Sequence, residues 1–487
     1  MSTVAFHTFG CKLNFSETST ISRMFKENGY QRTTITNNPD KVIINTCSVT
    51  ENADKSCRDL IKKIKKQSPS TKITIVGCYA QLKAESIIGI DGVDKVLGAK
   101  EKFDIKNYLD NYNGYKKSNI KEVNEFHTTF SVDDRTRSFL KIQDGCNYGC
   151  SFCTIPMARG RSRSSSNQEV LNNINSLIKR GSKEIILSGI NIGDYGIIEG
   201  KRKFTFYSLI KEINQIKTNV RFRISSIEPN LLSDEIIDLV YNSDKFVNHF
   251  HIPLQSGNNK ILKNMSRRYN TTLYSDRIKR IKSKMPDACI GCDVIVGFPG
   301  ESNEDFLETF EFIKKREIDY LHVFQYSERN NTRAVNINDV IPKPTRIKRS
   351  KMLRILSEKK KRNFYNNNLS LTKEIIIENG KDQKYLYGYT DNYVRVKVKR
   401  DNKILGKVKK VYLAFCYGAL DQNFIQIDKN ISRQKFQRTK FDTTETGGKN
   451  AITYVENLKI FYGSIIKLNC QIITGRTHQI RVHLLSL

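Results

Sequence analysis

Short apolar runs alternate with longer helix-like stretches from the start of this chain. The first three runs are Val4–Phe9, Val42–Asn45 and Ile73–Val76, and each has the length and the β-branched content of a buried strand. Strands that alternate with helices are typical of a parallel sheet covered by helices. The pattern therefore predicts that the chain opens with an α/β domain.

The same alternation resumes after a polar, charged stretch at about residues 111–137, which we expect to be a linker. Six further apolar runs follow, and helix-like segments separate them. Six such units predict an open or partial barrel rather than a complete barrel of eight. The predicted strands are Phe139–Gln143, Glu184–Leu187, Arg221–Ile224, His249–Leu254, Asp293–Val296 and Tyr320–Tyr326.

Two further patterns follow the predicted barrel. Residues 343–362 carry ten basic residues and one acidic residue, and they predict a basic helix that is either a solvated charged face or an RNA contact. Runs at Glu374–Glu378 and Tyr385–Lys399 then predict a small β module. The sequence changes character again around residues 407–412, so the last part is expected to be a separate segment.

Composition narrows the function only in part. The 487 residues carry a formal net charge of +32, which favours a polyanionic partner such as nucleic acid, although a chain rich in Lys, Asn and Ile reaches part of this excess by compositional drift. No signal peptide is recognisable, and no apolar run approaches the roughly 20 residues that span a bilayer. We therefore expect a cytoplasmic protein without a membrane partner.

Three cysteines lie within eight residues and carry the clearest chemical signal. Cys146, Cys150 and Cys153 have the spacing C-x3-C-x2-C. Three thiolates can hold three irons of a four-iron cluster and leave the fourth iron open to a substrate or cofactor. The loop follows the first strand of the predicted barrel, at the mouth where barrel chemistry is normally found.

A second cysteine group is predicted from position rather than from spacing. Cys11, Cys47 and Cys78 each follow one of the first three strands. Because the ends of parallel strands share one edge of a sheet, these thiols are expected to meet in space. The remaining pair at Cys289 and Cys292 is expected to pack in the core.

The histidines give no comparable signal. His249, His251 and His322 fall in strand patterns without a recognisable ligand constellation, so we expect them to be packing residues.

Four stretches resemble a known family, the radical S-adenosylmethionine methylthiotransferases that modify transfer RNA. The resemblance covers roughly residues 1–408. Within the family, the subgroup that acts on N6-threonylcarbamoyladenosine is most similar, because Lys12 follows Gly10-Cys11 where the isopentenyladenosine subgroup tends to have Gln and Met. The four stretches are Thr8–Asn14, Asn45–Thr50, Gly77–Gln81 and Cys146–Cys153.

The resemblance implies a fold and a domain order. Residues 1–120 would form a Rossmann-like parallel sheet that is the methylthiotransferase domain, and residues 135–365 would form the radical core, a partial (βα)6 TIM-type barrel. Residues 368–408 would form a small, truncated β module of the TRAM type that binds RNA. Residues 411–487 would form an α+β fragment.

The resemblance also implies cofactors and partners. Cys146, Cys150 and Cys153 would hold a [4Fe-4S] cluster that binds S-adenosyl-L-methionine, and Cys11, Cys47 and Cys78 would hold an auxiliary [4Fe-4S] cluster. The expected activity is methylthiolation of N6-threonylcarbamoyladenosine at position 37 of transfer RNA, beside the anticodon. The partners would be the anticodon loop, an electron donor such as flavodoxin or ferredoxin, and a sulfur source.

Three alternatives remain beside this expectation. The substrate could instead be isopentenyladenosine in transfer RNA or an aspartate of a ribosomal protein, although the basic charge disfavours the protein target. The chain could also be a fusion that retains only RNA binding. Six intact cluster cysteines argue against that last reading.

The last part of the chain resembles a different family, the RluA-type pseudouridine synthases. The match rests on residues 411–418 and, above all, on Thr474–Leu484. That family uses an aspartate in a His-Arg-Leu-Asp motif, and no such motif occurs in this sequence. The tail is therefore expected to be a fragment without pseudouridine synthase activity.

Overall fold

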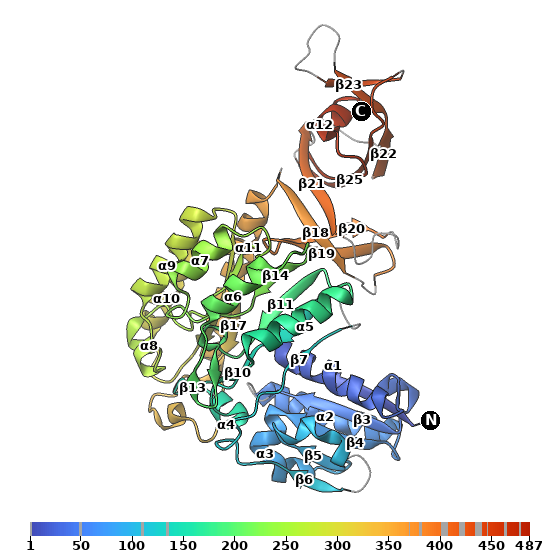
Figure 1. Cartoon of the computed structure of the whole chain (residues 1–487). Coiled ribbons are helices and arrows are strands. Elements are labelled where there is room, and N and C mark those ends of the chain that lie inside the picture. Colours follow the sequence, from blue (N-terminus) through green and yellow to red (C-terminus); the bar gives the residue numbers. More distant parts are fainter. Residues whose placement is uncertain are drawn as a thin grey trace. The chain divides into compact units, whose positions relative to one another are not determined.

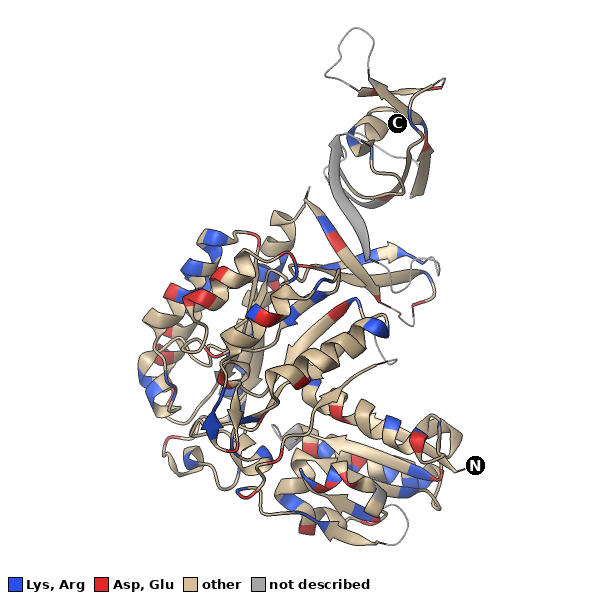
Figure 2. Ribbon diagram, viewed as in Figure 1, with Lys and Arg blue, Asp and Glu red and all other residues tan. Residues whose placement is uncertain are grey.

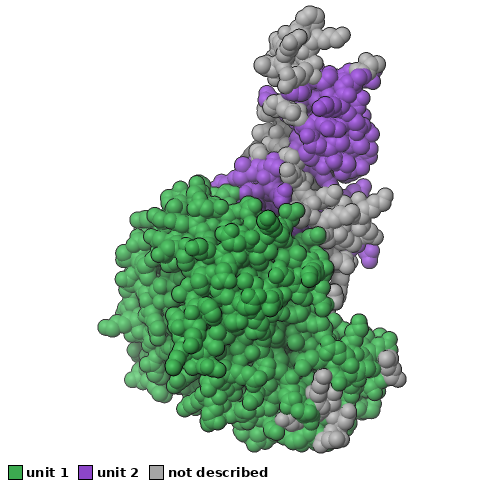
Figure 3. All heavy atoms as spheres, viewed as in Figure 1, with its two compact units in different colours: residues 1–360 green, residues 361–487 purple. Residues whose placement is uncertain are grey.

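The computed structural model divides into two compact units, residues 1–360 and 361–487 (Figure 3). No helix among its described residues is both long and apolar enough to cross a membrane. The described residues are 2–47, 51–108, 112–132, 136–369, 371–378, 382–400, 408–417, 424–433, 441–445, 447–461, 465–476 and 479–487.

A parallel sheet opens the first unit, as predicted (Figure 1). Its strands β1 (Thr3–Thr8), β3 (Lys41–Thr46) and β4 (Lys72–Gly77) correspond to the three predicted strands. Helices lie against the sheet: α1 (Lys12–Glu27), α2 (Glu51–Gln67) and α3 (Cys78–Ile88). The full strand order is β2-β1-β3-β4-β5-β6, with β2 at Gln31–Arg32, β5 at Lys95–Leu97 and β6 at Gly114–Lys116.

The centre of this sheet follows directly from its apolar runs. Ile44 in β3 and Ile75 in β4 are fully buried, and helical residues such as Ile61 and Ala84 pack on them in one core cluster. A parallel strand covered on both faces needs apolar side chains at nearly every position. This is why short continuous apolar runs were sufficient to locate these strands.

The partial barrel also agrees with the sequence. Six parallel strands follow one another, and an isolated parallel bridge between Ser226 and His251 joins the first three to the last three. No pairing closes the ring between the first and last of them among the described residues. The strands are β8 (Arg137–Lys141), β11 (Glu184–Ser188), β14 (Arg221–Ile224), β15 (His249–His251), β16 (Cys289–Val296) and β17 (Tyr320–Gln325).

Helices cover the outside of the barrel strands (Figure 1). In β11, Ile185 and Leu187 belong to the large apolar core that these helices share, whereas the alternate residue Glu184 points to the opposite face. The lumen is consequently polar on this side, although its residues are buried. The covering helices are α5 (Asn167–Lys179), α6 (Phe206–Gln215), α7 (Asp234–Tyr241), α9 (Thr271–Lys284) and α10 (Asn303–Lys315).

The expected linker at about residues 111–137 is partly structured, so that expectation was wrong for its described residues. Within it, β6 adds a sixth parallel strand to the first sheet, and β7 (Thr129–Phe130) pairs antiparallel with β8. Both strands are two or three residues long. Such short edge strands carry too few residues for a periodic signal, which explains why the sequence did not reveal them.

The basic helix is α11 (Lys343–Asn367). Two of its arginines are buried and bind loops of the barrel: Arg346 donates to the carbonyl oxygen of Tyr326 at 2.9 Å, and Arg349 donates to the carboxylate of Glu301 at 2.6 Å. These two residues are structural. Exposed lysines such as Lys348 and Lys351 remain on the solvent side.

The second unit is built on one antiparallel sheet with the order β20-β19-β18-β21-β26-β25-β22. The boundary expected between residues 408 and 411 falls inside β21 (Val408–Tyr417), which pairs with β18 (Thr372–Glu378) on one side and β26 (Ile465–Ile472) on the other. The remaining strands are β19 (Tyr385–Thr390), β20 (Arg395–Lys399), β22 (Phe424–Asp428) and β25 (Ile452–Phe461), and α12 (Gln479–Leu485) follows.

Candidate functional site

The loop with the three closely spaced cysteines begins where β9 (Gln143–Asp144) ends and runs into α4 (Ile155–Arg159). Gly145 starts the loop with φ of +70°, and a Cβ atom there would lie 2.0 Å from the carbonyl oxygen of Arg161. Only glycine fits this conformation and this close approach. The chain therefore turns sharply at the mouth of the barrel, where the cysteines follow.

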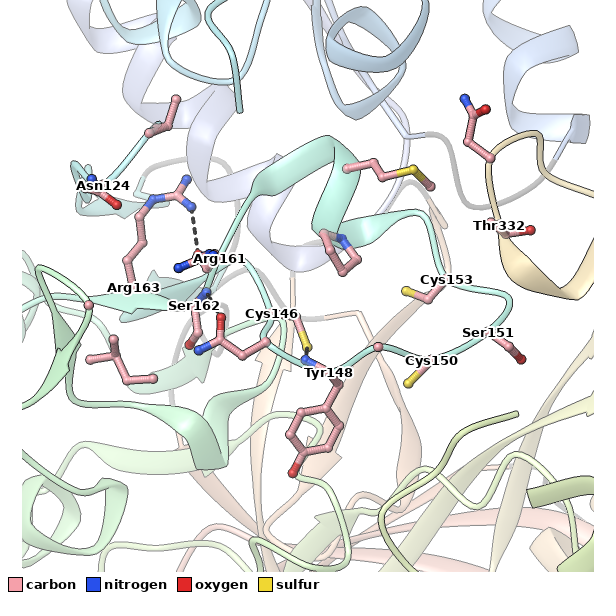
Figure 4. Close-up of a pocket in the computed structure, with 18 of the residues that line it drawn as sticks. Asn124, Cys146, Tyr148, Cys150, Ser151, Cys153, Arg161, Ser162, Arg163 and Thr332 are labelled. Carbon is pink, nitrogen blue, oxygen red and sulfur yellow. Dashed lines mark hydrogen bonds between the residues drawn. The ribbon is translucent and has the colours of Figure 1, made fainter. Parts of the chain in front are cut away.

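Cys146, Cys150 and Cys153 line one cavity of about 750 Å³ (Figure 4). Its other walls come from separate parts of the first unit: the segment before β7, the residues that lead into β10 (Arg163–Ser164), the turn between β12 (Ile197–Ile198) and β13 (Lys201–Arg202), and the loop after β17. A cavity of this size is in the range that accommodates a small-molecule cofactor. Its lining includes Asn124, Asn147, Tyr148, Arg161, Thr332 and Arg333.

Hydrogen-bond donors point at the cysteine sulfurs. The amide of Tyr148 donates to Sγ of Cys146 at 3.3 Å, and Nη1 of Arg267 donates to Sγ of Cys150 at 3.1 Å. Burial raises the pKa of Cys146 to about 11 and that of Cys153 to about 12. At Cys150, burial also raises the pKa, and Arg267 opposes the rise. Partly buried thiols with N–H donors directed at sulfur suit thiolates that bind a metal cluster in place of their protons.

Hydrogen bonds at Ser151 hold the cysteine loop in place. The amide of Ser151 donates to the carbonyl oxygen of Met265 at 3.1 Å, and its hydroxyl donates to that of Asn264 at 2.8 Å. The carbonyl oxygen of Ser151 accepts from the amide of Ala334 at 2.8 Å. Three bonds at one residue fix the loop between segments that follow β15 and β17.

The second group, Cys11, Cys47 and Cys78, follows the adjacent strands β1, β3 and β4 at one sheet edge, as predicted. Beside Cys11, Gly10 has φ of +109°, and a Cβ atom there would lie 2.7 Å from Cβ of Cys47. Asn14 donates to the carbonyl oxygen of Thr46 at 2.9 Å, which ties α1 to the end of β3. These contacts hold the loops of Cys11 and Cys47 against each other.

Arg159 connects the two cysteine groups. It lies in α4, just after the loop of Cys153, and its Nε donates to Sγ of Cys78 at 3.2 Å. Its Nη2 donates to Oδ1 of Asn14 at 2.9 Å. Burial raises the pKa of Cys78, whereas Arg159 acts to lower it. A thiolate at Cys78 would therefore have a permanent cation beside it.

A buried charge network surrounds Arg159. Glu17 accepts from Lys102 at 2.7 Å and from Nη1 of Arg159 at 2.9 Å, and it lies 3.4 Å from Nζ of Lys141. Asp144 accepts from Nη1 of Arg159 at 3.0 Å. Burial acts to raise the pKa of Glu17 and Asp144, but the cations outweigh it and hold both pKa values well below their usual range. The network joins α1 of the first sheet domain to β8, β9 and α4 of the barrel.

Two histidines expected to be packing residues, His251 and His322, converge with Asp293 in the barrel lumen. Oδ1 of Asp293 lies 3.2 Å from Nε2 of His251 and 3.3 Å from Nδ1 of His322, and the three side chains form a possible ligand set for a metal ion. Burial acts to raise the pKa of Asp293, but the two histidines outweigh it and lower that pKa. The expectation that these histidines have no constellation was wrong.

Several residues of the site escaped sequence reasoning. Arg159, Arg267 and Glu228 lie in irregular segments or in a helix of five residues, where no periodicity distinguishes a buried ion pair from a solvated one. Cys289 and Cys292 are buried in the core, as expected. All six cysteines proposed from the sequence lie in one of the two groups described above.

Three known families match parts of the chain. The family described as Radical SAM superfamily matches residues 140–313, and the uncharacterized protein family UPF0004 matches residues 3–98. The family described as RNA pseudouridylate synthase matches residues 399–486. The last match confirms the resemblance expected for the tail.

Curated relatives match over most of their length. The chain is 40% identical over 423 residues to threonylcarbamoyladenosine tRNA methylthiotransferase MtaB of Bacillus subtilis, with 84% of this chain and 93% of the relative covered. The protein of the same name in Aquifex aeolicus is 34% identical, with 84% and 100% covered. The tRNA-2-methylthio-N(6)-dimethylallyladenosine synthase of Clostridium tetani is 33% identical, with 83% and 92% covered.

Solved structures of radical enzymes are also similar. The radical S-adenosylmethionine methyltransferase TsrM of Kitasatospora setae aligns with 67% of this chain and 75% of its own, at 12% identity and a TM-score of 0.47.

The charge network predicts how stability depends on pH. Replacing Glu17 with Gln leaves three buried cations short of a counter-charge, which we expect to destabilise the protein by about 3–5 kcal/mol at neutral pH. In the unchanged protein, a carboxylate with a lowered pKa contributes stability that is present above about pH 4 and is lost as the pH falls below it. Thermal unfolding between pH 7 and pH 3 measures both effects.

Glu85→Gln is the matched control, because that glutamate is exposed and pairs with Lys117 at the surface. It should change stability by less than about 1 kcal/mol. Equal losses for the two variants would contradict the role assigned to Glu17.

Proposed function

Because the chain belongs to the transfer RNA methylthiotransferases that use radical S-adenosylmethionine chemistry, we propose that it converts N6-threonylcarbamoyladenosine at position 37 to its 2-methylthio derivative. The observation that carries the proposal is the pairing of two cysteine trios within one unit. Arg159 lies beside both, since it follows the loop of Cys153 and donates to Cys78. Sulfur insertion needs one centre that generates a radical and another that supplies sulfur, and two adjacent trios suit that division.

Each trio is proposed to hold one [4Fe-4S] cluster. Cys146, Cys150 and Cys153 would hold the cluster that binds S-adenosyl-L-methionine, and Cys11, Cys47 and Cys78 would hold the auxiliary cluster. Three thiolates leave one iron of each cluster without a protein ligand. When bound, these groups supply the radical that removes hydrogen from an aromatic carbon and the sulfur that replaces it.

The protein's own residues position these groups and limit access of water. The bonds at Ser151 fix the cysteine loop, and Arg267, itself paired with Glu228, directs an N–H at Sγ of Cys150. The aromatic ring of Tyr148 packs under Arg268, whose guanidinium lies 4.1 Å from the ring centre. Side chains that are held in place keep the reacting groups in the geometry of the reaction, and this positioning lowers the barrier to it.

Recognition of RNA is proposed to be electrostatic outside the cavity. Lys and Arg are spread over many elements of both units (Figure 2), and the net charge of +32 favours a polyanion. The exposed lysines of α11 and the β module would contact phosphates, while the modified base leaves the anticodon loop to reach the cavity. We further propose a cytoplasmic location, an electron donor such as flavodoxin or ferredoxin, and a separate sulfur source.

Iron content tests the two-cluster arrangement. After anaerobic reconstitution with iron and sulfide, we expect about eight irons per chain, falling to about four in Cys150→Ala and in Cys78→Ala. Cys57→Ala is the control, because Cys57 is buried in the apolar core and belongs to neither trio, so its loss should leave the count unchanged. A count near four in the unchanged protein would disprove the auxiliary cluster.

Mass spectrometry of transfer RNA nucleosides tests the substrate. Expression in a host that lacks its own enzyme should add a methylthio group to threonylcarbamoyladenosine, and Cys150→Ala should abolish the product. Accumulation of the methylthio derivative of isopentenyladenosine instead would move the protein to the activity named for its Clostridium tetani relative.

The tail is proposed to lack pseudouridine synthase activity. The sequence has no His-Arg-Leu-Asp motif, and His483, within the matching segment, is buried and bonded to Thr453 and to the carbonyl oxygen of Lys429. Tritium release from RNA labelled at carbon 5 of uridine should stay at background. Turnover above background would refute this prediction.

A further inference from the structure

Two histidines and one aspartate share the lumen-facing side of the last three barrel strands. Asp293 in β16 is paired directly with His322 in β17, and His251 in β15 is paired with Gly291, two residues before Asp293. Residues two apart in a strand point to the same face of the sheet. The register therefore places all three side chains together on one face.

The spacing of their ligand atoms fits a single metal ion. Oδ1 of Asp293 lies 3.2 Å from Nε2 of His251 and 3.3 Å from Nδ1 of His322. Two ligand atoms that are each about 2.0–2.1 Å from a tetrahedral zinc ion are about 3.3–3.4 Å apart. The ligand atoms of all three residues lie within 4.8 Å of one another, so one ion can contact them together.

Hydrogen bonding does not account for the contact between His251 and Asp293. The whole of His251 is only 7% exposed, and its Nε2 has no hydrogen-bond partner among the described residues. The carboxylate of Asp293 is close to this nitrogen, but it does not lie in the direction that an N–H bond requires. A buried ring nitrogen without a partner is costly, and a metal ion bound to nitrogen and carboxylate together would remove that cost.

Ser226 orients the ring of His251. Its hydroxyl oxygen lies 2.7 Å from Nδ1 of that ring. When Nδ1 carries the proton and donates it to this oxygen, Nε2 keeps its lone pair on the side of Asp293. Histidines that bind metals usually donate their other ring N–H to an oxygen in this way.

Tyr320 packs beside both histidines of the cluster. The centre of its ring lies 6.2 Å from that of His251 and 5.3 Å from that of His322. A Cβ atom at Gly291 would lie 2.1 Å from Cζ of Tyr320, so a glycine at this position makes room for the ring. The side chain of His322 is 56% exposed, which gives an ion a path from solvent to the cluster.

We propose that His251, Asp293 and His322 bind one divalent transition-metal ion, zinc or iron(II), whose remaining coordination positions are open to water or to a ligand oxygen. Two imidazole nitrogens and one carboxylate oxygen are a donor set that both ions accept. The site is additional to the two proposed clusters, because it uses none of their cysteines. It goes beyond the proposed function and does not depend on it.

Metal content tests the site, with zinc as the probe. The full chain is reconstituted with iron and sulfide, freed of loosely bound metal and dialysed against buffered zinc, and both metals are measured by elemental analysis. We expect about one zinc per chain beyond the iron of the clusters, and almost none in His322→Ala or Asp293→Asn. Ser226→Ala should weaken zinc binding about 10- to 100-fold, as the loss of a hydrogen bond to a ligand does. Iron retained in place of zinc supports the site when His322→Ala loses that iron and keeps the iron of the clusters.

His127→Ala is the matched control, because His127 is also partly exposed and lies 3.7 Å from a carboxylate, that of Glu125, outside the cluster. Its zinc content should equal that of the unchanged protein. Thermal unfolding without zinc checks that the variants fold; His322 is exposed, and Asn keeps the shape of Asp at residue 293. Absence of zinc and of additional iron from the unchanged protein, or an undiminished content in folded His322→Ala, would overturn the proposal.

The site and the proposed reaction have separate readouts. Metal that is bound by the unchanged protein and lost in His322→Ala would establish the site even if nucleoside analysis found no methylthio product. A methylthio product from a chain that binds no ion at these residues would keep the proposed function and reject the site.

Discussion

The pairing of Glu17 with Arg159 and two lysines is the interaction on which the first unit depends. It joins α1 of the first sheet domain to α4 and β8 of the barrel, and it does so beside both cysteine groups. A buried ion pair is weak support for stability in itself, because taking charges out of water costs nearly as much as their attraction returns. In this protein the network serves to fix the relative position of the elements that it joins. A network with fixed partners allows one relative placement of the two cysteine groups, whereas an apolar contact would tolerate sliding.

The sequence alone predicts the parts of the fold that bury continuous apolar surface. The three strands of the first sheet and the six of the barrel were found because parallel strands covered by helices are apolar along their length. Cys11, Cys47 and Cys78 could be grouped because strand order in such a sheet places the following loops at one edge. The cluster loop could be predicted without any knowledge of the fold, because the spacing of Cys146, Cys150 and Cys153 is local in sequence.

The interactions that the sequence did not predict are those between polar side chains far apart in the chain. Arg159 contacts Glu17, which is 142 residues away in sequence, and nothing in its own segment separates it from the exposed arginines nearby. His251, Asp293 and His322 are isolated polar residues in three strands, and only the register of β15, β16 and β17 brings them together. A single sequence shows which residues are polar, but the partner of a buried charge is decided by tertiary structure.

The pairing of β21 with β18 has a consequence for the part that the tail plays in the fold. A β-strand at the edge of a sheet offers unpaired amides and carbonyls to any passing strand, and natural proteins protect such edges against aggregation. Because β21 pairs with β18, the pseudouridine-synthase-like segment, which begins within β21, covers an edge of β18 that the preceding β module would otherwise present to solvent. A segment without the His-Arg-Leu-Asp motif can thus still protect an edge of the sheet. Removal of residues 411–487 would expose that edge.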